Sequence, residues 1–206
     1  MISDSGETDV LLRRAREGEA EALGDLLRRY SGRLERMVRL RIDRRLQGRI
    51  DVADVLQEAF LVATRAFDRY SDLPTGSFFV WLRRIVERQI IDVHRRHLGA
   101  QARDARREIS IDQGLWTEAT SAALAAHLLG SLPTPSEAAV RAELRARIEA
   151  ALDALDPLDR EVLALRHFEQ LTNGETAEVL GIRESAASKR HLRALERLKE
   201  VLKGIR

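Results

Sequence analysis

Basic side chains are concentrated in two segments whose spacing suits contact with nucleic acid. Eight Lys and Arg residues lie between Arg183 and Arg206 against three acids, which gives this segment a net charge of +5. Eight arginines against three acids between Arg83 and Arg107 give the same net charge. The whole chain of 206 residues carries only +2, so the remainder is acidic. Two basic patches on an acidic body predict two DNA contacts and a separate acidic surface, although solvated helix faces would give a similar pattern.

The C-terminal basic segment has the layout of a helix-turn-helix. Thr172 or Asn173 can cap a short helix, and Gly181 permits the left-handed turn that follows it. In the second helix the expected inward face is Ala187, His191, Leu195, Leu198 and Leu202. The expected outward face is Ala186, Lys189, Arg190, Arg193 and Arg197. Any helical hairpin with a glycine turn resembles this motif, but the basic outward face favours DNA binding in the major groove.

The segment from Ser77 to His97 predicts a second basic helix, with aromatic residues among its arginines. Its expected buried stripe is Phe79, Leu82, Val86, Ile90 and Val93. The opposite face carries Trp81, Arg84, Arg88 and Arg95 at spacings of three, four and seven residues. Aromatic rings beside arginines suit single-stranded DNA, because bases stack on the rings while the arginines hold phosphates. Trp81 could instead be a packing residue, and Phe78 could join it or enter the core.

The segment from Asp51 to Phe67 predicts an amphipathic helix with an acidic face. Its expected inward residues are Val52, Val55, Leu56, Ala59, Val62, Ala63 and Ala66. Its expected polar face holds Asp51, Asp54, Gln57, Glu58 and Arg65, with Leu61 in the middle. An apolar centre with a polar rim is typical of a protein docking surface. A single exposed leucine among solvated acids is also an ordinary surface feature.

These segments fit an all-α chain of two small helical domains joined by a long flexible linker. Helices are expected at 8–17, 20–45, 52–69, 77–97, 136–154, 158–168, 173–180 and 184–203, with breaks at Gly18 and Gly48. Residues 98–136 lose the helical periodicity and gather glycine and proline, although a short helix at 118–129 is compatible with them.

Composition narrows the function classes further. The chain has no cysteine, which excludes disulfides and cysteine-ligated zinc. His94, His97 and Asp92 could be imagined as metal ligands, but His94 and His97 flank two arginines whose charge opposes a cation, so no metal and no cofactor are expected. The sequence offers neither a nucleophile with organised acids nor a membrane-spanning or signal segment. We therefore expect a soluble cytoplasmic protein without catalysis of its own, which disfavours a DNA-processing enzyme such as a recombinase.

Taken together, these motifs resemble the bacterial RNA polymerase sigma factors of the extracytoplasmic-function type. DVADVLQEAFLVATRAFDRY is similar to the family's polymerase-binding helix, and GSFFVWLRRIVERQIIDVHRR to its promoter-melting and minus-ten helix. LDPLDREVLALRHFEQLTNGETAEVLGIRESAASKRHLRALERLK resembles the region that contacts the minus-thirty-five element. The resemblance implies a region 2-like domain at 1–97, a linker at 98–136 and a region 4-like domain at 137–206.

The resemblance also implies partners and site residues. Core RNA polymerase, through the clamp helices of its largest subunit, would be bound by Asp54, Gln57 and Glu58, with Leu61 on the same face. Minus-ten DNA would meet Trp81, Arg84, Asp92, Arg95 and Arg96, and Arg88 lies on that helix face. Minus-thirty-five DNA would meet Lys189, Arg190 and Arg193, with Ser188 and the outward-facing Arg197 beside them. Glu87, the Ser188–Lys189 order and His191 depart from the family's usual pattern, which leaves the promoter sequence open.

The expected function is therefore that of a transcription initiation factor that takes core polymerase to promoters and assists strand opening. An anti-sigma factor is a further partner that the resemblance allows. The main alternative is a stand-alone helix-turn-helix regulator with an N-terminal sensing or dimerisation domain, which would bind DNA tightly without polymerase. A purely structural helical adaptor is the third alternative, and the two basic patches count against it.

Overall fold

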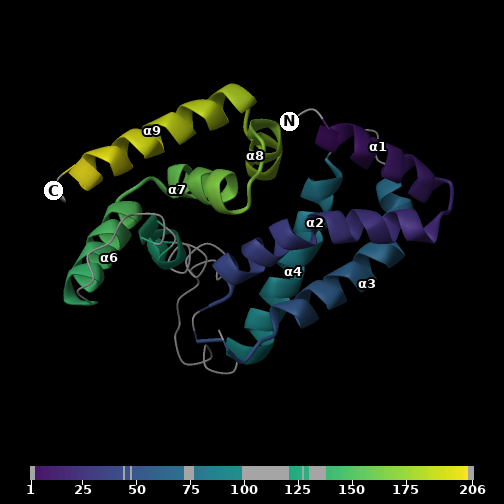
Figure 1. Cartoon of the computed structure of the whole chain (residues 1–206), viewed down its shortest axis with the longest axis horizontal. Helices are drawn as coiled ribbons and strands as arrows, with labels where there is room; N and C mark the ends of the chain where they lie inside the picture. The colour runs from purple at the N-terminus through teal and green to yellow at the C-terminus, as the bar shows by residue number, and fades with distance from the viewer. Residues whose placement is uncertain are drawn as a thin grey trace. The chain divides into compact units, whose positions relative to one another are not determined.

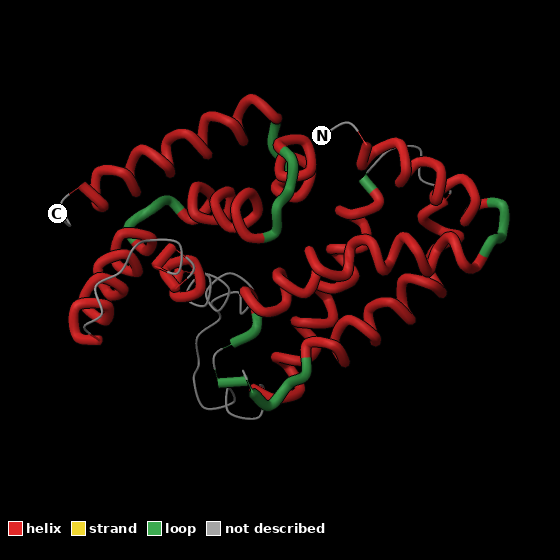
Figure 2. Tube along the Cα trace, viewed as in Figure 1, coloured by secondary structure: helices red, strands yellow, loops and turns green. Residues whose placement is uncertain are grey.

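The protein folds into two compact helical units, seen in a computed structural model (Figures 1 and 2). The structure describes residues 3–43, 45–46, 48–71, 77–98, 121–126, 128–129 and 138–203. Unit 1 comprises Met1–Arg39 and Gly48–Val93, and unit 2 comprises Leu40–Gln47 and His94–Arg206. Most of the predicted linker, namely residues 99–120, 127 and 130–136, lies outside the described residues.

Unit 1 is built from α1 (Ser3–Arg16), α2 (Ala20–Arg41), α3 (Val52–Ser71) and α4 (Phe78–Leu98), and the ends of α2 and α4 pass into unit 2. The predicted helices are confirmed, with breaks at Gly18 and Gly48, which both adopt positive φ. Helix α2 was predicted to reach residue 45 but ends at Arg41. The Asp43 carboxylate accepts the backbone N–H of Arg45 at 2.8 Å, and this local turn replaces the helical hydrogen bond.

An aromatic cluster fixes α4 within unit 1. Phe78 is buried and its ring lies 5.4 Å from Tyr70 and 6.3 Å from Phe67, both on α3, and 5.9 Å from Tyr30 on α2. Trp81 stacks beside it, 4.8 Å from Tyr70 and 5.4 Å from Phe78. Tilted and edge-on ring pairs of this kind add to the stabilisation from burial. The cluster therefore sets which face of α4 turns outward.

Unit 2 contains α6 (Ala138–Asp153), α7 (Pro157–Leu163), η2 (Ala164–Phe168), α8 (Asn173–Leu180) and α9 (Glu184–Lys203). Residues 121–126 and 128–129 are also helical, and Leu124, Ala125 and Leu129 enter its apolar core. The single helix predicted at 158–168 is instead divided. After Leu163 the backbone widens into a π-helical turn, in which the Glu169 N–H donates to the Ala164 carbonyl five residues earlier.

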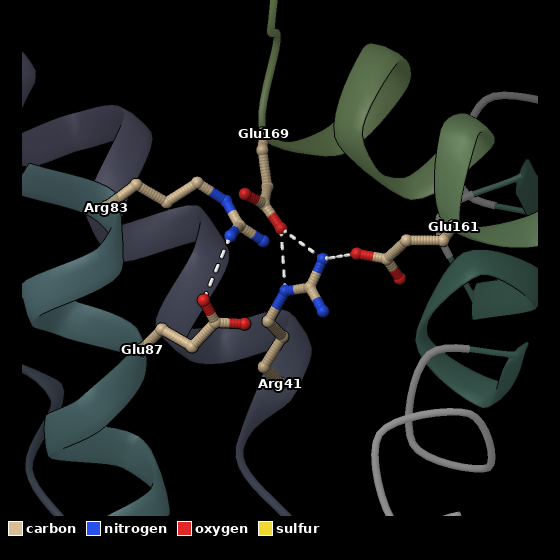
Figure 3. Close-up of polar contacts among 5 residues, drawn as sticks. All are labelled: Arg41, Arg83, Glu87, Glu161 and Glu169. Atoms are coloured by element: carbon tan, nitrogen blue, oxygen red, sulfur yellow. Dashed lines mark hydrogen bonds and ion pairs between the residues drawn. The ribbon is translucent and has the colours of Figure 1, made fainter. Parts of the chain in front are cut away.

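A buried ion-pair cluster of Arg41, Glu161 and Glu169 lies within unit 2 (Figure 3). Arg41 is only 3% exposed and Glu169 is fully buried. The Arg41 Nε donates to Glu169 Oε1 at 2.7 Å, and its terminal nitrogen also pairs with Glu161. Burial disfavours the charged guanidinium, but the charges of Glu161 and Glu169 outweigh burial and raise the pKa of Arg41.

Within the ranges that the structure describes, every helix is too short or too polar to cross a lipid bilayer.

Candidate nucleic-acid interface

The acidic face of α3 is arranged as the sequence predicted. Asp51, Asp54, Gln57, Glu58 and Arg65 are all exposed, and Leu61 is 54% exposed among them. Val62 was expected to face inward but is 39% exposed. The buried stripe runs through Val55, Ala59 and Ala63, so Val62 falls at its edge and enlarges the apolar centre of the face.

The basic face of α4 is likewise confirmed as an exposed surface. Arg84, Arg88, Asp92, Arg95 and Arg96 are all exposed, while the predicted stripe of Phe79, Leu82, Val86, Ile90 and Val93 is buried. Trp81 is half-buried, because one side of its ring contacts Tyr70 and Phe78. Trp81 therefore is a packing residue that stays partly exposed. Phe78 belongs to the core.

One arginine of α4 is not part of this exposed face. Arg83 is 1% exposed, and its terminal nitrogen lies 3.4 Å from Glu87 one turn later (Figure 3). In the sequence, Arg83 was assigned only to the basic charge of this segment. Its spacing of four residues to Glu87 was the available signal for an ion pair along the helix.

The helix-turn-helix in unit 2 is closed by the predicted cap and turn. The Thr172 hydroxyl accepts the Glu175 N–H at 3.1 Å, and the Glu175 carboxylate accepts the Thr172 N–H at 2.8 Å. Gly181 takes φ 64° at the end of α8, a left-handed conformation that glycine adopts without strain. The amide of Asn173 then donates to the Glu184 carbonyl, and its oxygen accepts from the Ser188 hydroxyl at 3.1 Å. These bonds join the start of α8 to the first turns of α9.

The outward face of α9 carries the predicted basic residues, but its inward face is rotated from the prediction. Ser188, Lys189, Arg193 and Arg197 are exposed. The buried stripe is Ala187, Ala194 and Leu198, so Leu195 is 36% exposed rather than inward and His191 is only half-buried. Two alanines seven residues apart let α9 approach its neighbours closely, which turns Leu195 and the unassigned Leu192 toward solvent. Leu202 lies outside the residues whose side chains are described.

Arg190 is the predicted DNA residue that the structure places differently from the others. Its terminal nitrogen Nη1 donates to Asp159 Oδ1 at 2.7 Å and to Asp156 Oδ1 at 3.1 Å, both at the start of α7. The hydrogen bond to Asp159, together with both negative charges, raises the pKa of Arg190. Asp156 and Asp159 were not predicted from the sequence as partners of Arg190, although an aspartate before Pro157 is a helix-start signal.

Two histidines meet beside the same helix. The Nε2 atoms of His167 on η2 and His191 on α9 lie 2.9 Å apart, so the N–H of one ring donates a hydrogen bond to the nitrogen of the other. Burial, followed by the charges of His167 and Arg166, lowers the pKa of His191. His94 is a separate case, because its Nε2 accepts the Asp43 N–H at 3.2 Å and burial lowers its pKa. Across the described ranges, no three His, Asp or Glu side chains lie close enough together to hold a metal ion.

Comparison with known proteins agrees with this geometry. The family model for sigma-70 region 2 matches residues 26–98, and that for sigma-70 region 4 matches residues 145–198, together more than half of the chain. The chain is 28% identical to the RNA polymerase sigma factor NccH of Alcaligenes xylosoxydans xylosoxydans, covering 98% of both proteins. It is 27% identical to the sigma-E factor of Escherichia coli K12, covering 95% of this chain and 94% of that protein.

A solved structure of CnrH in complex with the cytosolic domain of CnrY is also similar. Its TM-score is 0.54 at 25% identity, over 96% of this chain and 98% of that one. The matched ranges contain the acidic face of α3, the basic face of α4 and the helix-turn-helix. The chain belongs to the RNA polymerase sigma factors of the extracytoplasmic-function type, and it directs polymerase to specific promoters.

Proposed function

We propose that the two units divide promoter recognition between them. In this proposal the domain at 1–97 binds core polymerase and opens the minus-ten element. The domain at 137–206 contacts the minus-thirty-five element. Residues 98–136 connect the two, although Leu124, Ala125 and Leu129 of this segment belong to the core of unit 2. The polymerase performs the phosphodiester chemistry, and this chain contributes binding energy and specificity without catalysis of its own.

The exposed Leu61 and Val62 within a polar, largely acidic face carry the polymerase-docking part of the proposal. Two neighbouring apolar side chains that are exposed to water do not stabilise the isolated protein, but they can form the desolvated centre of an interface with a partner. Asp54, Gln57 and Glu58 surround them and give the patch a charge that suits a basic partner surface. We assign this patch to the clamp helices of the largest polymerase subunit.

The basic face of α4 supports contact with the minus-ten element. Trp81 presents part of its ring beside Arg84 and Arg88, which suits stacking with an unpaired base and contact with phosphates. Asp92, Arg95 and Arg96 continue the exposed face toward the end of the helix. Unstacking a base step costs a few kcal/mol. Several phosphate contacts and a stacked base could together offset this cost.

The exposed basic residues of α9 support contact with the minus-thirty-five element. Lys189, Arg193 and Arg197 face solvent, and Ser188 lies beside them within hydrogen-bond distance of Asn173. The sequence prediction also included Arg190, whose guanidinium donates to Asp156 and Asp159 instead of facing outward. The complex of CnrH with the cytosolic domain of CnrY supports one further partner, an anti-sigma factor that holds this chain when it is inactive.

Charge reversal on the acidic face tests the docking proposal. We expect Asp54→Arg combined with Glu58→Arg to abolish capture by core polymerase. The matched control is Asp9→Arg combined with Glu17→Arg, which reverses two exposed acids outside the region 2 match. Core binding by a folded Asp54/Glu58 variant at the level of this control would overturn the assignment. Tight, sequence-specific DNA binding by the free chain would instead favour a stand-alone regulator.

A further inference from the structure

Arg190 is tied to the helix that packs beneath α9. Its side chain is 28% exposed, and Nη1 donates to both Asp159 and Asp156 at the start of α7. These contacts join residues more than thirty positions apart, from two different helices. In Figure 1, α7 and α9 lie alongside each other within unit 2. The arginine therefore links the body of the unit to the helix that carries its exposed basic face.

The two carboxylates have a reason to be at this place before Arg190 is considered. Asp156 caps α7, since its Oδ1 accepts the Leu158 N–H at 2.9 Å and Pro157 occupies the first helical position. Asp159 lies in the first turn, where the helix dipole favours a negative charge. Both acids are thus suited to the start of α7, and Oδ1 of each also accepts a hydrogen bond from Arg190 on α9.

Asp159 requires the ion pair with Arg190 because its side chain is fully buried. A buried carboxylate is tolerated only when a positive charge or several hydrogen-bond donors compensate it. Among the described residues, Oδ1 has its hydrogen bond from Arg190, whereas Oδ2 is buried without one and has Arg193 Nη1 at 3.7 Å. Moving Arg190 onto a DNA phosphate would remove the principal compensation of this carboxylate.

We propose that Arg190 is a positioning residue that fixes the rotation of α9 through Asp159, and that Lys189, Arg193 and Arg197 rather than Arg190 contact promoter DNA. This inference rests on the proposed function of α9. A helix rotated by one residue turns its side chains through about 100°. Holding Arg190 against α7 therefore decides which neighbouring side chains point outward. The Arg193 side chain is 53% exposed, yet its Nη1 lies 3.7 Å from Asp159. Arg193 therefore borders both the proposed DNA contact and the ion pair that positions α9.

The behaviour of Asp159 separates positioning from direct DNA contact. Asp159 is buried and negative, so it cannot bind DNA, and its charge alone opposes the approach of phosphates. If Arg190 contacted DNA, replacing Asp159 by asparagine would leave promoter affinity unchanged or increase it. If Arg190 positions α9, the same substitution lowers promoter affinity, although it adds no surface and removes no positive charge.

The experiment measures promoter binding by reconstituted holoenzyme over a series of salt concentrations. The probe is a labelled duplex containing a promoter whose transcript start has been mapped with the same holoenzyme. The variants are Asp159→Asn, Arg190→Gln and their combination, and Lys189→Gln is the matched loss of an exposed charge. We expect Asp159→Asn and Arg190→Gln each to weaken binding about tenfold, with the combination no weaker than either alone.

The salt dependence of promoter affinity separates the two roles, because a loss of packing alone would leave it unchanged. Loss of one phosphate contact lowers the slope of log affinity against log salt by about 0.9. We expect this decrease for Lys189→Gln and an unchanged slope for Arg190→Gln.

A decreased slope for Arg190→Gln, or additive effects of Asp159→Asn and Arg190→Gln, would overturn the positioning role. If Lys189→Gln changed neither affinity nor slope, the proposed function of α9 would fail instead. Should Asp159→Asn not fold, the slope measured for Arg190→Gln decides alone.

Discussion

Helix α4 of unit 1 and helix α9 of unit 2 both present a row of exposed basic residues, yet different forces hold them in place. Aromatic rings of α2 and α3 pack against Phe78 and Trp81 and fix α4. Ion pairs from α7 and hydrogen bonds from Asn173 fix α9, whose buried stripe consists largely of alanines. The helix proposed to open DNA is thus positioned by aromatic packing, whereas in the helix proposed to contact the duplex ion pairs and hydrogen bonds add to a narrow apolar stripe.

The largest expected effect tests the apolar side of this comparison. Phe78→Ala should lower the free energy of unfolding by about 3–5 kcal/mol, because it removes the centre of the aromatic cluster. The loss should be nearly independent of salt, since no charge is involved. Denaturant unfolding at low and high salt measures both quantities. A loss below about 1 kcal/mol would show that the cluster does not secure α4.

A comparable loss is expected from the buried charges of unit 2. Glu169→Gln should destabilise the chain by about 3 kcal/mol, because the buried Arg41 keeps its charge and loses a carboxylate. The matched control is Glu149→Gln, which breaks the partly exposed pair with Arg145 and should cost less than about 1 kcal/mol. Equal losses for the two variants would contradict the central role of burial.

The exposed arginines of α4 should affect DNA without affecting stability. Arg84→Gln combined with Arg88→Gln should change the free energy of unfolding by no more than about 0.5 kcal/mol, because both side chains are exposed. Promoter opening by the holoenzyme should nevertheless fall severalfold, and its salt dependence should weaken. Permanganate reactivity of unpaired thymines measures the opening. Normal opening by this variant would remove α4 from the proposed minus-ten contact.

The smallest expected effect concerns the histidine pair beside α9. Burial and nearby positive charge lower the pKa of His191 below its usual 6.5, which the imidazole regains on unfolding. The unfolded chain therefore binds more protons at mildly acidic pH, and stability falls as the pH drops from about 7.5 to about 5.5. After allowance for solvent screening we expect at most about 1 kcal/mol. The free energy of unfolding of His191→Leu should vary less with pH than that of the unmodified protein. Identical pH profiles of the two proteins would exclude this contribution of His191.

The sequence predicted the helices well because local signals define their ends. The capping box at Thr172 and Glu175, the left-handed turn at Gly181 and the apolar period of α4 all depend on neighbours in sequence. The exposure of Leu61 followed from the same periodicity. These features needed no knowledge of which helices pack together.

The features that were not predicted depend mainly on contacts between segments distant in sequence, which the spacing of apolar residues does not reveal. Arg190 looks like its exposed neighbours in sequence, and only the packed structure pairs it with Asp156 and Asp159. The burial of Arg83 also became apparent only in the packed structure, although its pairing with Glu87 is local. The rotation of α9 toward Ala194 follows from close helix packing, so Leu195 was wrongly expected to face inward. The division of 157–168 into α7 and a π-helical turn likewise had no local signal.

One oxygen atom of unit 2 has a consequence for how the unit folds. Asp156 Oδ1 accepts both the Leu158 N–H within α7 and the Arg190 guanidinium from α9. The start of α7 is therefore complete only after a segment more than thirty residues later has docked. We expect α7 and α9 to gain protection from hydrogen exchange together, as one cooperative unit. A peptide containing α9 alone would lack the partner that orders its arginines, so such a fragment would not reproduce the behaviour of the intact protein.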